Sequence, residues 1–341
     1  MFAICTTGKG DGTVELRQVD VPKIGPKEML VKVVTAAQNP ADWKASGQQQ
    51  GVKVVGCDYA GIVTQLGDGV TEEVEVGDRI AGMVPGLEMN GAFAEYTAAP
   101  SHMFFKLPDS LSFEDASQLG IACYTTCQCL YQSQDLPSPE NPTTTPIDIL
   151  VWGGSSSVGH FVIQVAKLGG MRVIATASPR HFDRLKKLGA DEVFDYRDPE
   201  VTKKIRASAN GKLKHAVDCI SEGSTPQLIS DSLSPEGGTV SAILEYETVR
   251  PEVKVVFSLG YYLFGKPLGD FTPTTGMTDF GTTSSKLISK LLAEGKIVPA
   301  PLKIYPNGLA DVPEGLEFMK SGKVSGEKIV YRIADTPGVQ T

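Results

Sequence analysis

Short apolar runs punctuated by glycine dominate the first hundred residues. Residues 29–34 (Met-Leu-Val-Lys-Val-Val) and 60–66 (Ala-Gly-Ile-Val-Thr-Gln-Leu) each predict a strand, and residues 77–83 predict a turn that leads into a third. Short strands at this spacing are typical of a small barrel or a curled sheet. After them, Ser112 is predicted to cap a helix whose pattern continues through a cluster of cysteines.

The pattern changes after residues 136–146, which contain four prolines and can form neither a helix nor a central strand. Apolar strands then alternate with helices, which predicts a parallel sheet with helices on both faces. The predicted strands are residues 147–152, 172–176, 192–194, 216–220 and 239–244, and the predicted helices include 159–168 and 181–188. An amphipathic helix near residues 284–294 and a strand at 328–333 follow, and this tail is expected to complete the first domain.

Composition narrows the function classes. The chain has 341 residues, 41% of them hydrophobic, which suits two domains. Its 32 basic and 40 acidic residues give a net charge of -8, which argues against a nucleic-acid partner. The longest apolar run, residues 253–264, is too short for a membrane helix, and the N-terminus lacks the pattern of a signal peptide. Six cysteines are too few for a disulfide scaffold, so we expect a reduced, cytoplasmic protein without a membrane partner.

Two further clusters each allow two interpretations. Cys123, Cys127 and Cys129 lack the spacing of a zinc ribbon, and buried helix thiols explain them better than a metal site. Residues 172–214 carry 11 Lys or Arg against 6 Asp or Glu. This basic excess is either a docking face for an acidic partner or, as in most such runs, a set of solvated helix faces.

A glycine- and serine-rich loop at residues 152–159 (Trp-Gly-Gly-Ser-Ser-Ser-Val-Gly) lies between a predicted strand and a predicted helix. The dinucleotide fingerprint would require glycines at 154, 156 and 159, and here the middle position is Ser156. Gly154 is expected to supply the tight turn and Gly159 to allow close packing of helix on sheet. The loop amides and the hydroxyls of three successive serines predict an anion site for a pyrophosphate.

The end of the second strand of this domain predicts which dinucleotide binds. An NAD enzyme places Asp or Glu there, whereas residues 176–181 (Thr-Ala-Ser-Pro-Arg-His) contain no acid. A hydroxyl, a guanidinium and an imidazole suit a phosphate dianion instead, which favours NADPH. The alternative is that Arg180 merely begins an exposed basic helix face.

Several motifs together resemble the medium-chain dehydrogenase/reductase superfamily, in its zinc-free quinone-oxidoreductase and enoyl-reductase branch. They are residues 39–44 (Asn-Pro-Ala-Asp-Trp-Lys), 56–63 (Gly-Cys-Asp-Tyr-Ala-Gly-Ile-Val), 77–79, 91–96, the loop above and 188–191. Within this branch the chain is most similar to the fungal trans-acting enoyl reductases that serve polyketide synthases. That similarity rests on the proline-rich insertion and on residues 178–183, 194–197 and 325–328.

The resemblance implies an α/β protein with a GroES-like β-barrel substrate domain and a Rossmann domain with a doubly wound parallel sheet. The first would comprise residues 1–125 and 265–341, and the second residues 126–264. It also implies cofactor contacts. Ser155, Ser156, Ser157 and Val158 would bind the pyrophosphate; Ser178, Arg180, His181 and Tyr196 the 2′-phosphate; and Leu244, Val324 and Ser325 the nicotinamide half. Asp42 is a weaker candidate for a cofactor contact.

The same resemblance argues against a metal. In the zinc alcohol dehydrogenases of this superfamily, the catalytic ligands stand at positions that correspond to Asn39, Cys57 and Ile121. Only Cys57 could ligate, and one ligand does not hold zinc. Residues 86–91 pass directly into the Gly-Ala-Phe-Ala-Glu motif, so the cysteine-rich lobe of a structural zinc site is not expected either.

Without a Lewis acid, a conjugated alkene is easier to reduce than a simple ketone. Hydride adds to the β-carbon, negative charge develops on the carbonyl oxygen, and the α-carbon is then protonated, so a hydrogen-bond donor at that oxygen is the main requirement. The resemblance assigns this catalytic role to Lys44 and Thr125. Otherwise Lys44 is an exposed surface lysine, and Thr125 is a helix threonine that bonds back to a carbonyl.

These expectations describe an NADPH-dependent reductase of an α,β-unsaturated thioester carried by a polyketide synthase or an acyl carrier protein. One alternative is a stand-alone quinone or enone reductase that acts on free small molecules. Another is a protein that binds NADPH and has lost catalysis.

Overall fold

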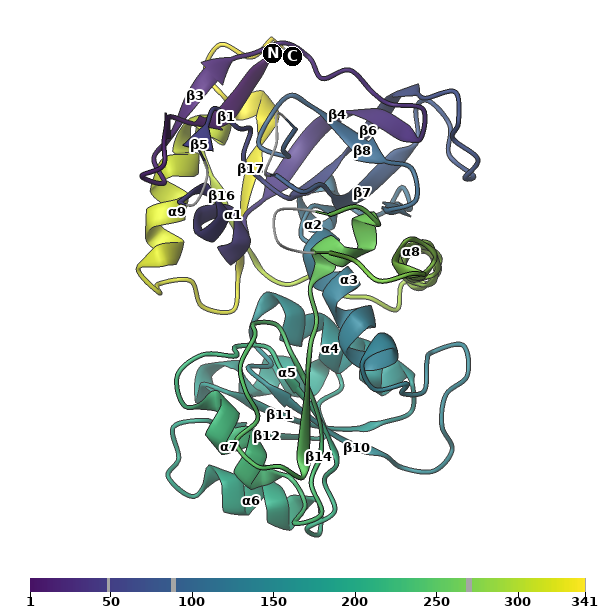
Figure 1. Cartoon of the computed structure of the whole chain (residues 1–341), viewed down its shortest axis with the longest axis vertical. Coiled ribbons are helices and arrows are strands. Elements are labelled where there is room, and N and C mark those ends of the chain that lie inside the picture. The colour runs from purple at the N-terminus through teal and green to yellow at the C-terminus, as the bar shows by residue number, and fades with distance from the viewer. Residues whose placement is uncertain (48–49, 87–89, 268–271, 341) are drawn as a thin grey trace. The chain divides into compact units, whose positions relative to one another are not determined.

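The structure is a computed structural model that describes residues 1–47, 50–86, 90–267 and 272–340. The chain divides into two compact units (Figure 1): Met1–Ile121 with Tyr261–Thr341, and Ala122–Gly260. The expected domain limits fall a few residues from these borders. No helix in the described residues is long and apolar enough to cross a membrane.

The first unit is built on a curled, mainly antiparallel sheet that uses both ends of the chain. Its strand order is β16 (Leu302–Tyr305), β17 (Lys328–Arg332), β4 (Glu28–Ala37), β6 (Asp58–Leu66), β7 (Arg79–Met83) and β9 (Phe104–Lys106), and β8 (Tyr96–Pro100) also pairs with β4. Two small ribbons pair β1 (Phe2–Thr6) with β3 (Val14–Gln18) and β2 (Gly8–Lys9) with β5 (Gln50–Gly51). The helices are α1 (Pro40–Ser46), α2 (Phe113–Ala116), α8 (Met277–Ala293) and α9 (Val312–Lys320).

Aromatic side chains from distant parts of the sequence close the core of this unit. The rings of Phe93 and Tyr331 are fully buried and meet edge-on, with centroids 5.6 Å apart. The C-terminal strand β17 pairs antiparallel with β4, with Tyr331 opposite Ala36. The tail therefore contributes both a strand and a core residue to the N-terminal sheet.

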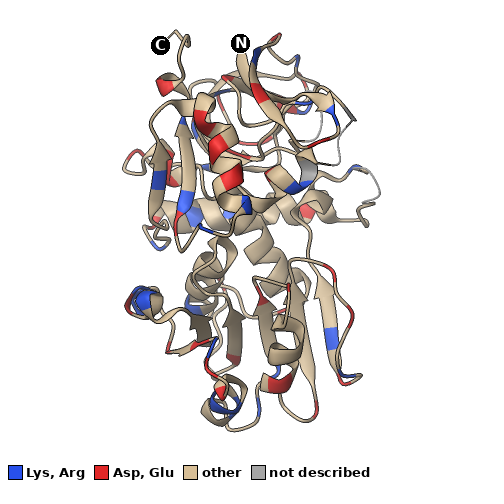
Figure 2. Ribbon diagram, turned by 90° about the vertical axis from the view of Figure 1, so that its left-hand side faces the viewer, with Lys and Arg blue, Asp and Glu red and all other residues tan. Residues whose placement is uncertain are grey.

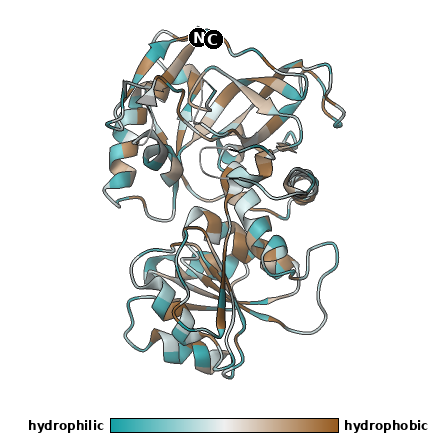
Figure 3. Ribbon diagram, viewed as in Figure 1, coloured by the Kyte–Doolittle hydropathy of each residue, from teal (hydrophilic) through white to brown (hydrophobic). Residues whose placement is uncertain are grey.

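The second unit contains a six-stranded parallel sheet. Its order is β12 (Glu192–Asp195), β11 (Arg172–Ala177), β10 (Asp148–Trp152), β13 (His215–Asp218), β14 (Gly238–Ala242) and β15 (Val253–Phe257). The helices are α3 (Gly120–Cys127), which begins in the first unit, α4 (Ser157–Leu168), α5 (Phe182–Lys187), α6 (Val201–Ser208) and α7 (Thr225–Ser232). Brown, hydrophobic residues lie along these strands in Figure 3, and the helices below them carry more teal, hydrophilic residues. The strand order reverses beside β10, as in a Rossmann sheet, so the predicted fold class is confirmed.

Several elements differ from the sequence prediction. The strand expected at 216–220 ends at Asp218, because its carboxylate accepts the backbone amides of Ile220 and Ser221 and turns the chain. The helix predicted after Ser112 stops at Ala116, although Ser112 caps it by accepting the amide of Asp115. Strand β15 and helices α6, α7 and α9 were not predicted. The proline-rich stretch contains only an isolated bridge, as expected.

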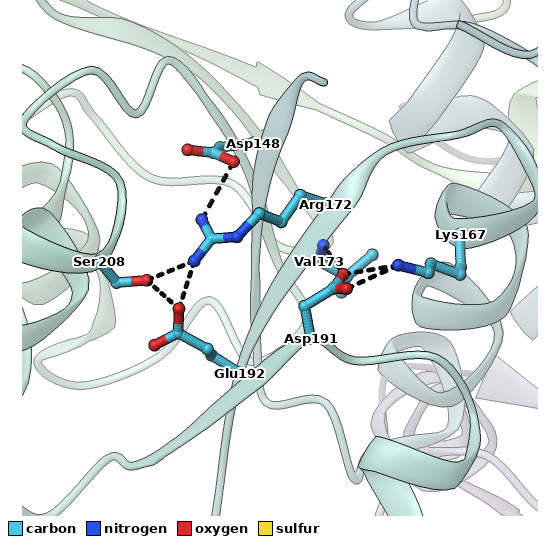
Figure 4. Close-up of polar contacts among 7 residues, drawn as sticks. All are labelled: Asp148, Lys167, Arg172, Val173, Asp191, Glu192 and Ser208. Carbon is cyan, nitrogen blue, oxygen red and sulfur yellow. Dashed lines mark hydrogen bonds and ion pairs between the residues drawn. The ribbon is translucent and has the colours of Figure 1, made fainter. Parts of the chain in front are cut away.

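A polar network joins the N-terminal ends of three strands of the parallel sheet (Figure 4). Arg172 donates to Asp148 at 3.1 Å and to Ser208 at 2.9 Å, and it also pairs with Glu192. These contacts connect α6 with the N-terminal ends of β10, β11 and β12. They hold the sheet together and lie away from the loop that follows β10.

We expect Arg172→Met to lower stability without altering cofactor binding. The guanidinium is partly exposed, so its loss should cost only about 1 kcal/mol of unfolding free energy. Thermal unfolding and NADPH titration of the variant check this. A variant with an unchanged melting temperature, or with weakened NADPH binding, would contradict this account of the network.

Candidate active site

The loop after β10 is held tightly against β11. The amide of Gly153 donates to the hydroxyl of Thr176 at 3.0 Å, and the amide of Gly154 donates to the carbonyl of the same residue at 2.8 Å. Gly153 has a φ of 79°, so it makes the tight turn that was expected of Gly154. A Cβ on Gly154 would lie 3.0 Å from the side chains of Ile163 and Leu185, so this glycine gives close packing instead.

Helix α4 begins at this loop, and its N-terminus points its free amides at the same place. The hydroxyl of Ser156 caps the helix by accepting the amide of Gly159 at 3.1 Å. A Cβ on Gly159 would lie 2.4 Å from the carbonyl oxygen of Gly153, so only glycine lets the helix approach the loop. The amides of Ser157 and Val158 lie in the first turn, where no intrahelical acceptor exists. The junction therefore fits a pyrophosphate, at the point where the strand order reverses.

A second polar group lies along the same edge of the sheet. Residues 178–181 follow β11, and Tyr196 follows β12; the last residues of these parallel strands, Ala177 and Asp195, are register partners. Ser178, Arg180, His181 and Tyr196 therefore lie at neighbouring strand ends. Burial, Arg184 and Arg180 lower the pKa of His181, so positive charges already gather there. An incoming phosphate would relieve that repulsion.

The residues predicted for the nicotinamide half lie in different units. Leu244 is half-buried just after β14, at the edge of the sheet that carries the loop. Val324 and Ser325 precede β17 in the first unit, where Val324 packs against the core. Their contacts with a cofactor remain predictions.

The two predicted catalytic residues also belong to different units. Lys44, on α1, has its Nζ 5.6 Å from the ring centroid of Trp43. It lines an open groove of about 400 Å³ between the 11–14 segment and α9. Thr125 is buried on α3, where its neighbour Thr126 makes the back-bond to the carbonyl of Ala122 at 2.8 Å. The catalytic roles of Lys44 and Thr125 remain predictions.

Two of the three positions at which zinc dehydrogenases carry ligands, Asn39 and Ile121, contact one buried carboxylate, which no sequence motif had singled out. Asp58 accepts the side-chain amide of Asn39 at 2.8 Å, the backbone amide of Ile121 at 2.7 Å and the ammonium of Lys328 at 3.2 Å. Lys328 also donates to Asn39 Oδ1 at 2.6 Å. Both charged side chains are almost completely buried. The buried ion pair of Asp58 and Lys328 therefore lies beside Asn39 and Ile121.

Cys57, the neighbour of Asp58 in sequence, contacts a different set of residues. Its Sγ lies 3.2 Å from the hydroxyl of Tyr261, and its thiol donates to the carbonyl oxygen of Pro85 at 3.6 Å. The buried carboxyl of Asp42 accepts the backbone amide of Asn39 at Oδ2, at 2.7 Å, and its Oδ1 has no hydrogen-bond partner among the described residues. Burial raises the pKa of Asp42 to about 7, and the charge of Asp58 adds to that rise. Burial likewise raises the pKa of the Cys57 thiol and of the Tyr261 hydroxyl.

Within the described residues, no group of three or more His, Cys, Asp or Glu side chains could hold a metal ion. Residues 87–89, in the segment where a structural zinc lobe was not expected, lie outside the described part of the chain. The three cysteines of the cluster are buried on α3 and in the short π-helix that follows it, and they form no disulfide, as expected. The absence of a metal remains a prediction, made from the types of residue at the three zinc-ligand positions.

Some of the cations of residues 172–214 form ion pairs inside the second unit. Acidic and basic residues alternate over this unit in Figure 2. Four of its cations form ion pairs: Arg172 with Asp148 and Glu192, Arg197 with Asp195, Lys203 with Glu200 and Lys204 with Asp198. Except for Asp148, the acidic partners belong to the same stretch, so these pairs leave its excess of positive charge in place.

Comparisons with known proteins agree with this architecture. The alcohol dehydrogenase GroES-like domain family matches residues 25–109, and the zinc-binding dehydrogenase family matches residues 157–258. The trans-enoyl reductase ACTTS2 of Alternaria alternata is 40% identical over 95% of this chain and 97% of its own. A trans-enoyl reductase of Gibberella fujikuroi is 36% identical over 96% of this chain and 97% of its own.

Solved structures show the same fold. An alcohol dehydrogenase superfamily protein from Novosphingobium aromaticivorans matches with a TM-score of 0.82 at 21% identity, over 97% of this chain and 99% of its own. The quinone oxidoreductase from Coxiella burnetii matches with a TM-score of 0.75 at 24% identity, also over 97% and 99%. The resemblance read from the motifs is confirmed. The chain belongs to the medium-chain dehydrogenase/reductase superfamily and, within it, to the trans-enoyl reductase family.

Proposed function

We propose that the protein is an NADPH-dependent enoyl reductase whose substrate is an α,β-unsaturated thioester on a carrier protein of a polyketide synthase. The family supports an oxidoreductase that reduces an enoyl group, and the parallel sheet with its loop implies a nicotinamide cofactor. The observation that carries the reaction class is the 40% identity to a trans-enoyl reductase over nearly the whole chain. The cofactor type and the carrier-bound substrate go beyond that similarity.

The preference for NADPH is supported by the strand ends after β11 and β12. Arg180 and His181 supply positive charge, and Ser178 and Tyr196 supply hydroxyls on neighbouring strands. No carboxylate lies between Ala177 and His181, where an enzyme specific for NAD would bind the ribose hydroxyls. Such a set recognises a 2′-phosphate.

The chain's own residues would then manage the charge that develops during reduction. The bound nicotinamide supplies the hydride that the β-carbon of the enoyl group accepts. Lys44 and Thr125 are proposed to donate hydrogen bonds to the thioester oxygen, where negative charge accumulates. We propose that no metal takes part. The side chain of Asn39 and the backbone amide of Ile121 donate hydrogen bonds to Asp58, and of the three positions only Cys57 has a side chain that could ligate zinc.

A second candidate function is a stand-alone reductase of free quinones or enones. The open groove that Lys44 lines favours it, because a free small molecule could enter such a groove without the docking of a carrier protein. The chemistry at the carbonyl and the cofactor site would be the same. Only the delivery of the substrate would differ.

Turnover with two acceptors side by side separates the candidates. We expect NADPH consumption with crotonyl-pantetheine to exceed that with a free enone or quinone, and Lys44→Ala to reduce it by about 100-fold, as for a lost transition-state donor. Lys320→Ala, which changes another lysine of the same groove, is the matched control and should retain activity. Preference for the free acceptor would support the second candidate. NADPH binding without consumption on any acceptor would indicate a non-catalytic protein.

A further inference from the structure

The open groove of the first unit has an apolar floor. It is lined by the 11–14 segment and by helices α1 and α9, which lie side by side (Figure 1). Val14 and Leu316 line it and are buried, and Trp43 packs partly buried against the core of the unit. Its volume of about 400 Å³ falls within the range of sites that hold a small organic ligand.

Contacts within the unit hold the walls of this groove in place. The side-chain amide of Gln38 donates to the carbonyl of Gly315 on α9 at 2.9 Å, and the hydroxyl of Tyr331 donates to Gln38. A Cβ on Gly315 would lie 1.8 Å from that hydroxyl, so glycine lets α9 approach the sheet closely. The turn at Gly12 packs against the end of α1, where a Cβ on Gly12 would lie 3.4 Å from the Cα of Gly47. Fixed walls lower the cost of ordering a binding site.

The rim of the groove is polar. Asp11 adds a carboxylate, Thr13 a hydroxyl and Lys44 an ammonium, and the charges of Asp11 and Lys44 cancel. Glu317 and Lys320 also line the groove, but they lie 3.7 Å apart, are mostly exposed and interact with each other. An apolar floor beneath such a rim fits a neutral chain that carries amides and hydroxyls on an aliphatic backbone.

We propose that this groove binds the pantetheine arm of the thioester substrate, with the thioester at Lys44. The inference rests on the proposed function, in which Lys44 donates to the thioester oxygen, and it adds where the arm lies. Pantetheine is a neutral chain with amides, hydroxyls and a carbon that bears two methyl groups. Its methyl and methylene groups would cover Trp43 and Leu316, and its amides would meet Asp11 and Thr13.

The acyl group is the other part of the substrate. An unsaturated acyl chain would cover the floor but would give Asp11 and Thr13 no hydrogen bonds, whereas the arm supplies amides to both. The arm is also the same for every acyl group that a carrier protein presents. A site for the arm therefore serves substrates with different acyl groups.

Shortening the arm tests the proposal on the wild-type protein. We expect kcat/KM for crotonyl-pantetheine to exceed that for the ethyl thioester of crotonic acid by about 50-fold. Each methyl or methylene group that leaves water contributes roughly 4-fold, so burying three of them gives about this factor. The difference should lie in KM, because the arm makes the same contacts before and during the reaction. Equal kcat/KM values for the two thioesters would overturn the proposal.

Filling the groove locates the effect. Gly47 lines the groove, and a Cβ there would make only ordinary contacts, 3.8 Å from the carbonyl oxygen of Trp43. Gly47→Phe adds a ring at this wall and should reduce the preference for the pantetheine thioester to less than about 5-fold. Val76→Phe, which adds a ring at an exposed position that does not line the groove, is the control and should keep the wild-type preference. An unchanged preference in Gly47→Phe would overturn the proposal.

Binding of the arm can also be measured without turnover. Trp43 is one of two tryptophans in the chain, and the other, Trp152, is buried in the second unit. Butyryl-pantetheine, which has no double bond to reduce, should change the fluorescence of Trp43, and the ethyl thioester of butyric acid should not. Trp43→Phe should lose the signal. An unchanged spectrum in the wild type, or equal changes with both thioesters, would overturn the proposal.

The proposed function and this inference fail in different ways. The proposed function is judged by whether the wild type reduces crotonyl thioesters with NADPH. If it reduces the ethyl and pantetheine thioesters equally well, the proposed function holds and the inference fails. If it reduces neither, a fluorescence change specific to butyryl-pantetheine still supports the arm site while the proposed function fails. The absence of both turnover and a fluorescence change would overturn both.

Discussion

Replacing Gly159 with alanine is expected to weaken NADPH binding by about 100-fold or more. The new Cβ would lie 2.4 Å from the carbonyl oxygen of Gly153 and 2.8 Å from Cα of Gly154, both of them backbone atoms that cannot rotate away. Helix α4 or the loop must shift, and the amides of the first turn leave the pyrophosphate. Hydrogen bonds to a charged group contribute about 1.5–3 kcal/mol each, so losing two accounts for this change. Fluorescence titration with NADPH measures it.

A second glycine-to-alanine change supplies the control. Gly281 lies in helix α8, where a Cβ would make ordinary contacts at 3.6 Å. Gly281→Ala should bind NADPH like the wild type. Wild-type affinity in a folded Gly159→Ala protein would show that the loop is not the pyrophosphate site.

The double change Arg180→Ala and His181→Ala should raise the KM for NADPH by about 100-fold or more and leave the KM for NADH nearly unchanged. These side chains would interact only with the 2′-phosphate, which NADH lacks, and each charged hydrogen bond contributes about 1.5–3 kcal/mol. Steady-state kinetics with both cofactors gives the ratio directly.

Lys186→Ala serves as the control for this change, because Lys186 is an exposed cation of the helix that follows. It should leave the cofactor ratio unaltered. A parallel loss with NADPH and NADH in the double variant would mean that Arg180 and His181 support the fold and do not select the cofactor. A wild type that prefers NADH would contradict the assignment outright.

The parallel sheet could be predicted because its signals are local. Apolar strands of four to six residues alternate with helices, and the loop after β10 carries its own turn and helix-capping residues. Strand β15 was missed because Lys254 interrupts its apolar run and only pairing with β14 defines it. Helix α6 was missed because it follows a stretch of charged residues without a capping side chain.

The candidate site was predictable only where a motif is contiguous. The serines of the loop and the residues after β11 stand together in sequence, so their roles could be proposed before the structure. Asp58 belongs to the motif at residues 56–63, and Lys328 is the last residue of the motif at 325–328. No local pattern predicts that these two side chains, 270 positions apart in sequence, form a buried ion pair. Tyr261 has no sequence signal. Its proximity to Cys57 depends on the return of the chain to the first unit.

The account's central claim is reduction of a carrier-bound enoyl thioester with NADPH. The most direct measurement incubates the enzyme with a crotonyl-loaded acyl carrier protein and NADPH deuterated at C4, and then analyses the released acyl group by mass spectrometry. We predict a saturated butyryl group that carries one deuterium, located at the β-carbon. An unreduced crotonyl group, or a butyryl group without deuterium at the β-carbon, would contradict the claim.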